Sequence, residues 1–150
     1  MSPNGADASV EIRTAAPDDR LGVRRVLDAA MLDVREDLRE RLAAGDVLVA
    51  RETRSDEGGV DSPVLGALVL CSRGDRAGRV DAVAVRRARR GQGVGSALVR
   101  AAAERHARLV AEFDSDVVPF YESLGFDVRP VSGGDGRLRG VYEVEERTRR

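Results

Sequence analysis

The sequence of 150 residues contains no lysine, no tryptophan, one cysteine and one histidine. The single cysteine, Cys71, excludes an intrachain disulfide, and together with the single histidine, His106, it gives too few ligands for a structural zinc site. A Cys–His nucleophile pair is not expected either, because Cys71 lies in an apolar run and His106 lies among charged residues. The absence of lysine also excludes a phosphate-binding loop of the kind whose lysine contacts the phosphates.

The chain also lacks an excess of charge of either sign. Its formal net charge is −1, so there is no electrostatic basis for binding nucleic acid or a membrane surface. No apolar stretch approaches the about 18 residues that would cross a bilayer, and no signal-peptide core is visible. We therefore expect a cytoplasmic protein with no nucleic-acid or membrane partner and no metal.

What the chain does contain is typical of a globular protein, with 42% hydrophobic and 34% charged residues. Its length suits one domain over residues 1–150, with a disordered start over residues 1–8. The apolar periodicity predicts the element order β-α-α-β-β-β-α-β-α-β-β. The predicted strands are 10–13, 46–52, 64–71, 80–85, 109–113, 126–129 and 138–144, and the predicted helices begin at Pro17, within 31–45, at Val94 and near Val117.

The segment that follows the strand over 80–85 carries the clearest chemical signal. Three alternate glycines, Gly91, Gly93 and Gly95, stand where a helix begins, with an apolar helical stripe starting at Val94. Glycine removes the Cβ atoms that would keep a ligand from the backbone, and the first N–H groups of a helix attract anions. Four arginines precede or flank this turn: Arg86, Arg87, Arg89 and Arg90. The pattern predicts a phosphate-binding turn.

The spacing Arg90-x-x-Gly93-x-Gly95 resembles the coenzyme A signature of the GNAT family of N-acyltransferases. A second segment, Phe-Tyr-Glu-Ser-Leu-Gly-Phe over residues 120–126, resembles the family's closing helix and turn. The two segments occur in the family's order. The resemblance implies a mixed α/β (α+β) sheet of the GNAT fold and transfer of an acetyl group from acetyl-CoA to an amine.

The resemblance also implies where the coenzyme binds. The acyl thioester would lie where the parallel strands ending at Val85 and Phe113 move apart, and backbone groups would pair with the pantetheine amides as an added strand does. The pyrophosphate would be held by amides of the glycine turn, with charge from Arg90 and, as an open alternative, from Arg86 or Arg87. The implied coenzyme-binding residues are Val83, Ala84, Val85, Arg90, Gly91, Gln92, Gly93, Val94, Gly95, Ser96 and Asp114.

The implied reaction is direct attack of a neutral amine on the thioester carbonyl. Tyr121 occupies the place of the family's general acid, and its neutral phenol would donate to the departing thiolate. Asp81, Glu112 and Asp114 are candidates for the base, and Asp81 is expected to share a strand face with Val83 and Val85. Asp114 stands where many family members have asparagine, so that coenzyme contact is a departure from the family pattern.

Several alternatives stay open at this point. Tyr121 has a pure packing role as its alternative, and each carboxylate has a surface role. The whole chain has two competing assignments, a non-catalytic acyl-CoA-binding regulatory module and a dinucleotide-binding protein; the second lacks the third glycine of G-x-G-x-x-G, because Ser96 occupies that place. The acceptor amine, small molecule or peptide, is undetermined, as is the formation of a homodimer.

Overall fold

The computed structural model describes residues 10–29, 38–52, 63–73, 77–131 and 136–143. Within these ranges the strands form a single seven-stranded sheet in the order β1-β2-β3-β4-β5-β7-β6. The strands are β1 Val10–Thr14, β2 Val47–Glu52, β3 Val64–Arg73, β4 Ala77–Val85, β5 Arg108–Phe113, β6 Asp127–Pro130 and β7 Leu138–Glu143. The helices are α2 Arg20–Ala29, α3 Leu38–Ala43, α4 Val94–Glu104 and α5 Val118–Ser123, with 3-10 turns at Pro17–Asp19 (η1), Arg87–Arg89 (η3) and Ser115–Val117 (η4).

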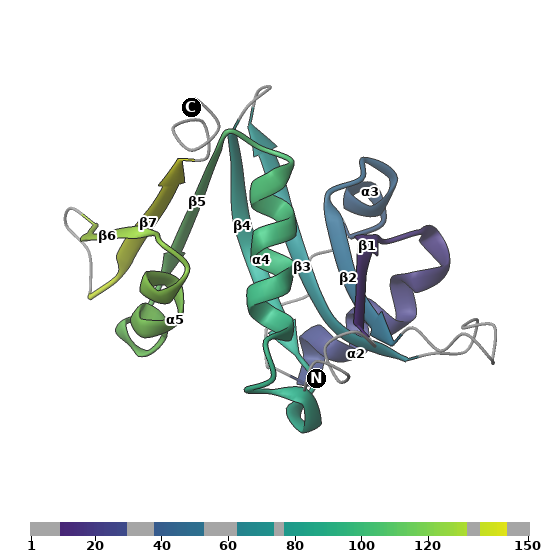
Figure 1. Ribbon diagram of the computed structural model, residues 1–150. Coiled ribbons are helices and arrows are strands. Elements are labelled where there is room, and N and C mark those ends of the chain that lie inside the picture. The colour runs from purple at the N-terminus through teal and green to yellow at the C-terminus, as the bar shows by residue number, and fades with distance from the viewer. Residues whose placement is uncertain (1–9, 30–37, 53–62, 74–76, 132–135, 144–150) are drawn as a thin grey trace, which may run out of the picture.

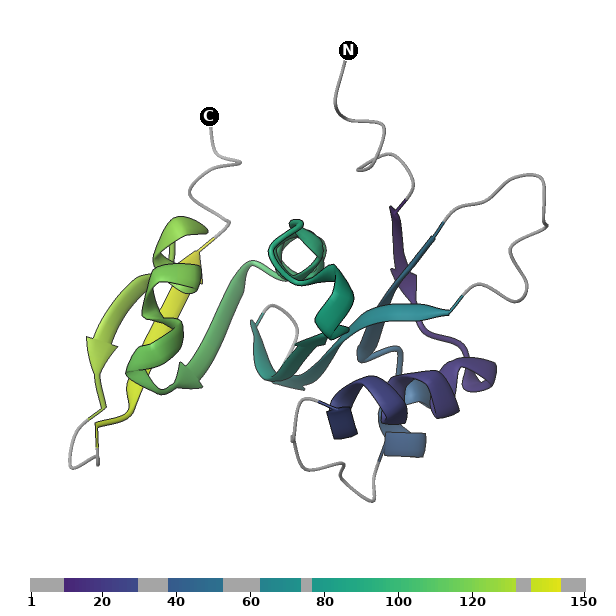
Figure 2. The ribbon, with the colours of Figure 1, turned by 90° about the horizontal axis from the view of Figure 1, so that it is seen from below.

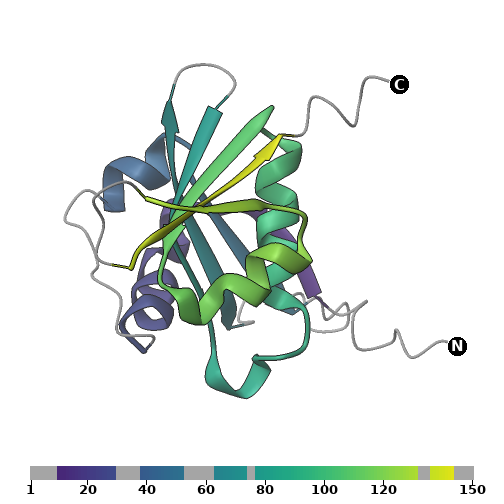
Figure 3. The ribbon, with the colours of Figure 1, turned by 90° about the vertical axis from the view of Figure 1, so that its left-hand side faces the viewer.

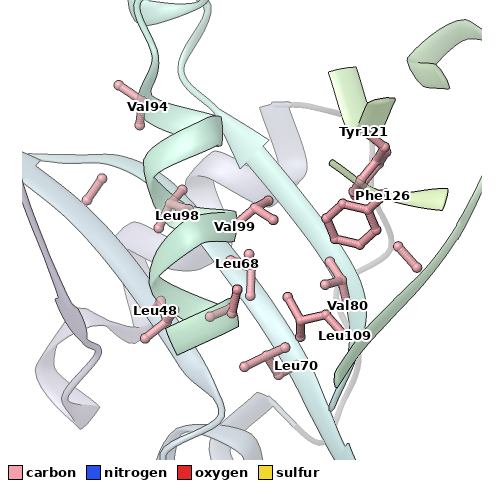
Figure 4. Close-up of a cluster of buried hydrophobic side chains, with 14 of the residues drawn as sticks. Leu48, Leu68, Leu70, Val80, Val94, Leu98, Val99, Leu109, Tyr121 and Phe126 are labelled. Atoms are coloured by element: carbon pink, nitrogen blue, oxygen red, sulfur yellow. The ribbon is translucent and has the colours of Figure 1, made fainter. Parts of the chain in front are cut away.

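The helices divide the sheet into two covered faces. Figure 2 shows α4 on one face and α2 with α3 on the other. The core on the α4 face includes Leu68, Val80 and Leu98, and Figure 4 shows side chains of α4 meeting those of the strands there. The core on the other face includes Val23, Val49 and Ala84. Alternate residues of each central strand therefore serve different cores, as the two-residue period of a strand requires.

Helix α4 approaches the sheet closely because β3 has a glycine beneath it. A Cβ on Gly66 would lie 3.1 Å from Cγ1 of Val94 and 3.2 Å from Cδ1 of Leu98. These two apolar residues are fully or almost fully buried, so the first turn of α4 is fixed against the sheet. The glycine-rich turn before α4 is thereby held next to the end of β4.

Strands β4 and β5 are the only parallel pair of the described sheet, and they pair over a short distance. Their register runs from Ala77↔Arg108 to Val80↔Ala111 and includes no later residue of either strand. Figure 1 shows the two strands side by side at one end and moving apart toward the end where α4 begins. The last five residues of β4, 81–85, therefore keep β3 as a neighbour but have no partner strand on the β5 side.

The separation coincides with a β-bulge in β4. Between β3 and β4 the register passes from Val69↔Ala82 to Leu70↔Val80, which leaves Asp81 as the extra residue. A bulge bends its strand and increases the local twist. The extra residue also shifts the alternation of side chains between the two faces of the sheet by one residue. The face on which a residue after Asp81 lies therefore cannot be counted in steps of two from the residues before it.

Beyond β5 the chain forms a separate edge of the sheet. Strand β7 inserts between β5 and β6, and α5 packs against this part, as Figure 3 shows from that side. Gly125, with φ +95°, ends α5 and lets Phe126 turn back so that its N–H donates to the carbonyl oxygen of Tyr121 at 3.1 Å. The turn brings the ring of Phe126 against that of Tyr121.

The predicted order of strands and helices is confirmed, and so is the parallel pairing of the strands that carry Val85 and Phe113. The predicted helix over 117–124 divides into a 3-10 turn and α5. The start of the chain over residues 1–8, which the sequence predicts to be disordered, lies outside the described residues.

Candidate active site

The turn between β4 and α4 presents unpaired backbone donors. Gly91 and Gly93 have φ of +78° and +88°, a conformation that favours glycine, and a Cβ on either would meet nothing within 4 Å. The first N–H to bond within the helix is that of Ala97, which donates to the carbonyl oxygen of Gly93 at 3.0 Å. The N–H groups of residues 94–96 therefore have no partner inside the helix. A turn open above two glycines, followed by free donors, fits a phosphate.

The four arginines of this turn are not equivalent. Arg89 is committed to structure, since it donates to Oε2 of Glu52 at 2.9 Å and to Oε1 of Gln92 at 3.0 Å. Arg90 is exposed, and its Nε donates to the carbonyl oxygen of Val85 at 3.0 Å. Arg90 therefore bridges the end of β4 and the glycine turn, which places a positive charge beside the open donors.

The backbone of β4 alternates its polar groups between the two neighbouring strands. The N–H of Arg86 donates to the carbonyl oxygen of Leu65 at 2.8 Å, which makes these two residues a hydrogen-bonded pair of the antiparallel ladder. Alternation along the ladder makes Ala84 and Ala82 hydrogen-bonded to β3 as well. The N–H and C=O groups of Val83 and Val85 then point away from β3, toward the side that β5 has left.

This alternation corrects one element of the predicted coenzyme contacts. Ala84 was expected to pair with pantetheine together with Val83 and Val85, but its backbone groups belong to the ladder with Ala67 of β3. Its side chain is 4% exposed and lies in the core under α2. Only two of the three β4 residues can therefore offer backbone groups to a ligand lying along the free side of the strand.

Tyr121 is buried in an aromatic cluster beside the end of β5. Its ring stacks on Phe113 with centroids 4.3 Å apart, and it meets Phe120 and Phe126 edge-on at 4.9 Å and 5.1 Å. The residue is 7% exposed. Burial raises the pKa of the Tyr121 phenol to about 12, and no described residue hydrogen-bonds to the hydroxyl. The phenol is therefore neutral at ordinary pH and keeps its proton available for a ligand.

Asp81 lies on the face opposite to the one predicted. Val83 and Val85 pack on the α4 side, whereas the carboxylate of Asp81 accepts a hydrogen bond from Arg41 of α3 at 3.0 Å. The expectation that all three share a face is wrong because the bulge at Asp81 shifts the alternation by one residue. The side chain of Asp81 is 15% exposed, and Arg79 approaches its other oxygen at 3.7 Å.

Glu112 lies on the same face as Asp81, at the matching position of β5. Leu109, Ala111 and Phe113 fill the core on the α4 side, so Glu112 points to the other face. Val80 and Ala111 form the last β4–β5 pair, and Asp81 and Glu112 are the next residues of their strands. The two carboxylates therefore stand where the strands begin to separate.

Asp114 lies apart from this position. It follows the end of β5, is exposed, and is ion-paired with Arg137 at 3.2 Å. Glu112 also has an arginine partner, Arg139, its cross-strand neighbour on β7, at 3.0 Å. No pattern in the sequence identifies these arginines, or Arg41, as partners of the carboxylates. Each contact depends on the register between strands or on the way α3 packs on the sheet.

The arrangement indicates a protein that binds an acyl-carrying nucleotide. It combines an open glycine turn at a helix start, a strand with free backbone groups, and a neutral buried phenol. A family model described as an acetyltransferase (GNAT) domain matches residues 43–128, more than half of the chain. The chain therefore belongs to the GNAT family, and the matched domain and the fold are those of an acetyl-CoA-dependent N-acetyltransferase.

Solved structures share the fold at low sequence identity. Ard1 from Thermoplasma volcanium superposes with a TM-score of 0.68 at 21% identity, over 91% of this chain and 98% of that one. Rv2747 from Mycobacterium tuberculosis, solved with coenzyme A, gives 0.69 at 16% identity, over 89% and 98%. N-acetylglutamate synthase from Neisseria gonorrhoeae, solved with coenzyme A and L-arginine, gives 0.71 at 16% identity, over 91% of this chain but 33% of that one.

Among curated protein sequences, none matches the chain significantly. In the part of the chain that the structure describes, no helix has the length and apolar character needed to cross a bilayer.

The buried phenol gives a direct spectroscopic prediction. The chain has two tyrosines and no lysine, so alkaline titration is followed at 295 nm with few other groups ionising. We expect one tyrosine to ionise with a pKa of about 12, and Tyr121→Phe to remove that component while Tyr142→Phe retains it. Because the folded pKa lies above the unfolded reference of about 10, unfolding becomes easier as pH rises from about 10 to 12.

The expected loss of stability at high pH is tested with the same two variants, Tyr121→Phe and its control Tyr142→Phe. The raised pKa corresponds to a loss of stability on the order of 2 to 3 kcal/mol across that pH range. Urea unfolding of Tyr121→Phe should lack this contribution. If both tyrosines of the native protein ionised together near the reference value, the buried and unpartnered position of Tyr121 would be contradicted.

Proposed function

We propose that the chain acetylates a primary amine by direct attack of the neutral amine on the thioester of acetyl-CoA. The amine nitrogen bonds to the carbonyl carbon, the carbon–sulfur bond breaks, and the amine loses a proton as coenzyme A leaves as the thiol. The observation that carries this proposal is the separation of β4 from β5 immediately after Val80, which leaves the backbone groups of Val83 and the N–H of Val85 facing the open side. Holding the two reactants in that opening supplies much of the rate.

The coenzyme is proposed to follow β4 from the glycine turn toward the point of separation. The open positions above Gly91 and Gly93 and the N–H groups of residues 94–96 would take the pyrophosphate. Arg90 would add charge, and the pantetheine amides would pair with Val83 and Val85 as an added strand does. The N–H of Val83, near the thioester, would stabilise negative charge on the carbonyl oxygen.

The amine is proposed to enter from the face that carries α2 and α3. The glycine turn lies at the start of α4, and the side chains of α4 fill the core on the α4 face of the sheet. The coenzyme is therefore assigned to the α4 face, which leaves the α2 and α3 face for the amine. Asp81 and Glu112 stand on the entry face at the point of separation. Their carboxylates would attract a cationic amine and accept its proton, directly or through water.

Tyr121 is proposed to donate to the departing sulfur. Complete proton transfer from a phenol with a pKa of about 12 to a thiolate whose thiol has an ordinary pKa near 8.5 is uphill by about 5 kcal/mol. A hydrogen bond from the phenol stabilises the thiolate without that cost, and solvent then supplies the proton. This narrows the role from a general acid to a hydrogen-bond donor for the leaving group.

A non-catalytic acyl-CoA-binding module is the second candidate. Such a module would bind the coenzyme at the same site as the enzyme, but it would give no function to the neutral, unpartnered phenol of Tyr121. Small-molecule and peptide amines both remain candidates for the acceptor, and the relative from Neisseria gonorrhoeae was solved in one crystal with N-acetyl-glutamate. The cytoplasmic location, the single domain and the homodimer stay predictions from the sequence.

The glycine turn is tested with a matched pair of substitutions. Gly93→Ala should weaken acetyl-CoA binding tenfold or more, because its Cβ would project into the space assigned to the pyrophosphate. Gly136→Ala introduces alanine at nearly the same backbone angle, φ +90°, in the β6–β7 connection, also with open space around it. Calorimetric titration should show unchanged affinity for Gly136→Ala. Equal losses in the two variants would mean that backbone strain, rather than blocked space, explains the effect.

The role of Tyr121 is tested by turnover. With acetyl-CoA and a panel of amines, release of free thiol should be at least tenfold slower for Tyr121→Phe, while the affinity for coenzyme changes less than twofold. Tyr142→Phe is the control, since Tyr142 also contacts Phe126 but lies on β7. Equal rates for native protein and Tyr121→Phe would remove the phenol from the mechanism. Tight coenzyme binding with no turnover of any amine would favour the non-catalytic module.

A further inference from the structure

A well-formed cavity lined by described residues lies outside the proposed coenzyme site. Its volume is about 780 Å³, and it is enclosed by η1 and α2 on one side and by residues at the ends of the strands on the other. Val26 and Val64 of its wall belong to the core under α2, so the cavity opens on the α2 face of the sheet. Cavities of about 300 to 1,000 Å³ are those that commonly hold small molecules.

The wall of this cavity carries a strong local charge. Five arginines line it, against two aspartates, Asp18 and Asp19. The wall therefore has three more positive than negative side chains, although the whole chain has a net charge of −1. The lining arginines are Arg13, Arg25, Arg51, Arg86 and Arg87.

Of the two aspartates in the wall, Asp19 is buried and its carboxylate is already hydrogen-bonded within the protein. Asp19 is 4% exposed, and its carboxylate accepts hydrogen bonds from Arg51 at 2.7 Å, from Arg13 at 3.3 Å and from the N–H of Ala16 at 2.8 Å. A buried carboxylate with this many donors holds both arginines in fixed positions. One side of the cavity is thus a rigid, positively charged wall.

The other three arginines are free to contact a ligand. Arg25, Arg86 and Arg87 are exposed, and none of their side chains forms an ion pair or hydrogen bond with another described residue. They come from α2 and from the chain just after β4, so they face the cavity from two directions. Three like charges around one cavity repel one another, and an anion between them relieves that repulsion.

The cavity and the start of α4 lie toward different faces of the sheet. The glycine turn precedes α4, whose first residue Val94 lies in the core on the α4 face, whereas the cavity opens on the α2 face.

We propose that this cavity binds a small oligoanion, a molecule with two or more phosphate or carboxylate groups, separately from the coenzyme. Guanidinium groups bind both kinds of group through paired N–H donors, and arginine keeps its charge at any working pH. The cavity holds such a ligand beside the chain that connects β4 to the glycine turn, and it does so whether or not the protein proves to be a catalyst.

The test uses the full chain with inorganic triphosphate and, separately, citrate as the added anions. In protein saturated with acetyl-CoA, calorimetry should show at least one of them binding with one-to-one stoichiometry, and affinity should fall as salt rises. Titration without coenzyme should give the same affinity within a factor of two. Absence of binding by both anions would overturn the proposal, as would displacement of the bound anion by acetyl-CoA.

Two neighbouring arginines of α2 provide a matched control. Arg25→Glu should weaken anion binding tenfold or more, because Arg25 lines the cavity. Arg24→Glu makes the same charge change at an exposed residue of the same helix that does not line it, and should change the affinity less than twofold. Equal losses in the two variants would show a general charge effect and contradict a defined site.

A last arm separates the proposed ligand from the coenzyme's own 3′-phosphate. Coenzyme A and dephospho-coenzyme A should each bind Arg25→Glu as tightly as they bind the native protein. If Arg25→Glu lost affinity for coenzyme A but not for the dephospho form, the cavity would be the 3′-phosphate site, and the proposal of a separate ligand would be wrong. Either result is obtained without any measurement of acetyl transfer.

Discussion

The parallel pairing of β4 and β5 ends after Val80 and Ala111, and the arrangement of the site follows from that ending. One extra residue in β4, Asp81, bends the strand at this position. Beyond it β4 keeps β3 as its neighbour but has no partner on its other side. An unpaired strand edge inside a sheet would be a liability in most proteins, whereas a ligand with amide groups can complete it.

The bulge at Asp81 also determines which side chains of β4 lie on each face of the sheet. After the bulge, Val83 and Val85 pack on the α4 side and Ala84 on the α2 side, while Asp81 itself turns toward Arg41 of α3. The glycine turn and Tyr121 belong to the α4 side, and the carboxylates belong to the other. A coenzyme and an acceptor approaching from opposite faces would meet where the strands separate.

The sequence was sufficient for features that local chemistry determines. Alternate glycines before an apolar helical stripe predicted the turn before α4, and the order of strands and helices followed from periodicity. It was not sufficient for features that depend on register. The strict two-residue period placed Asp81 with Val83, and only the shifted pairing with β3 shows the opposite face. Arg139 meets Glu112 because β7 inserts beside β5, which no local pattern indicates.

The central claim is that the free side of β4 receives the pantetheine arm. Amide hydrogen exchange followed by NMR tests this residue by residue, because the N–H groups of Val83 and Val85 face that side while those of Ala82 and Ala84 face β3. With saturating acetyl-CoA, exchange at one or both of the two valines should slow tenfold or more, and exchange at the two alanines should change less than twofold. Unchanged exchange at both valines, or equal slowing at all four residues, would contradict the account.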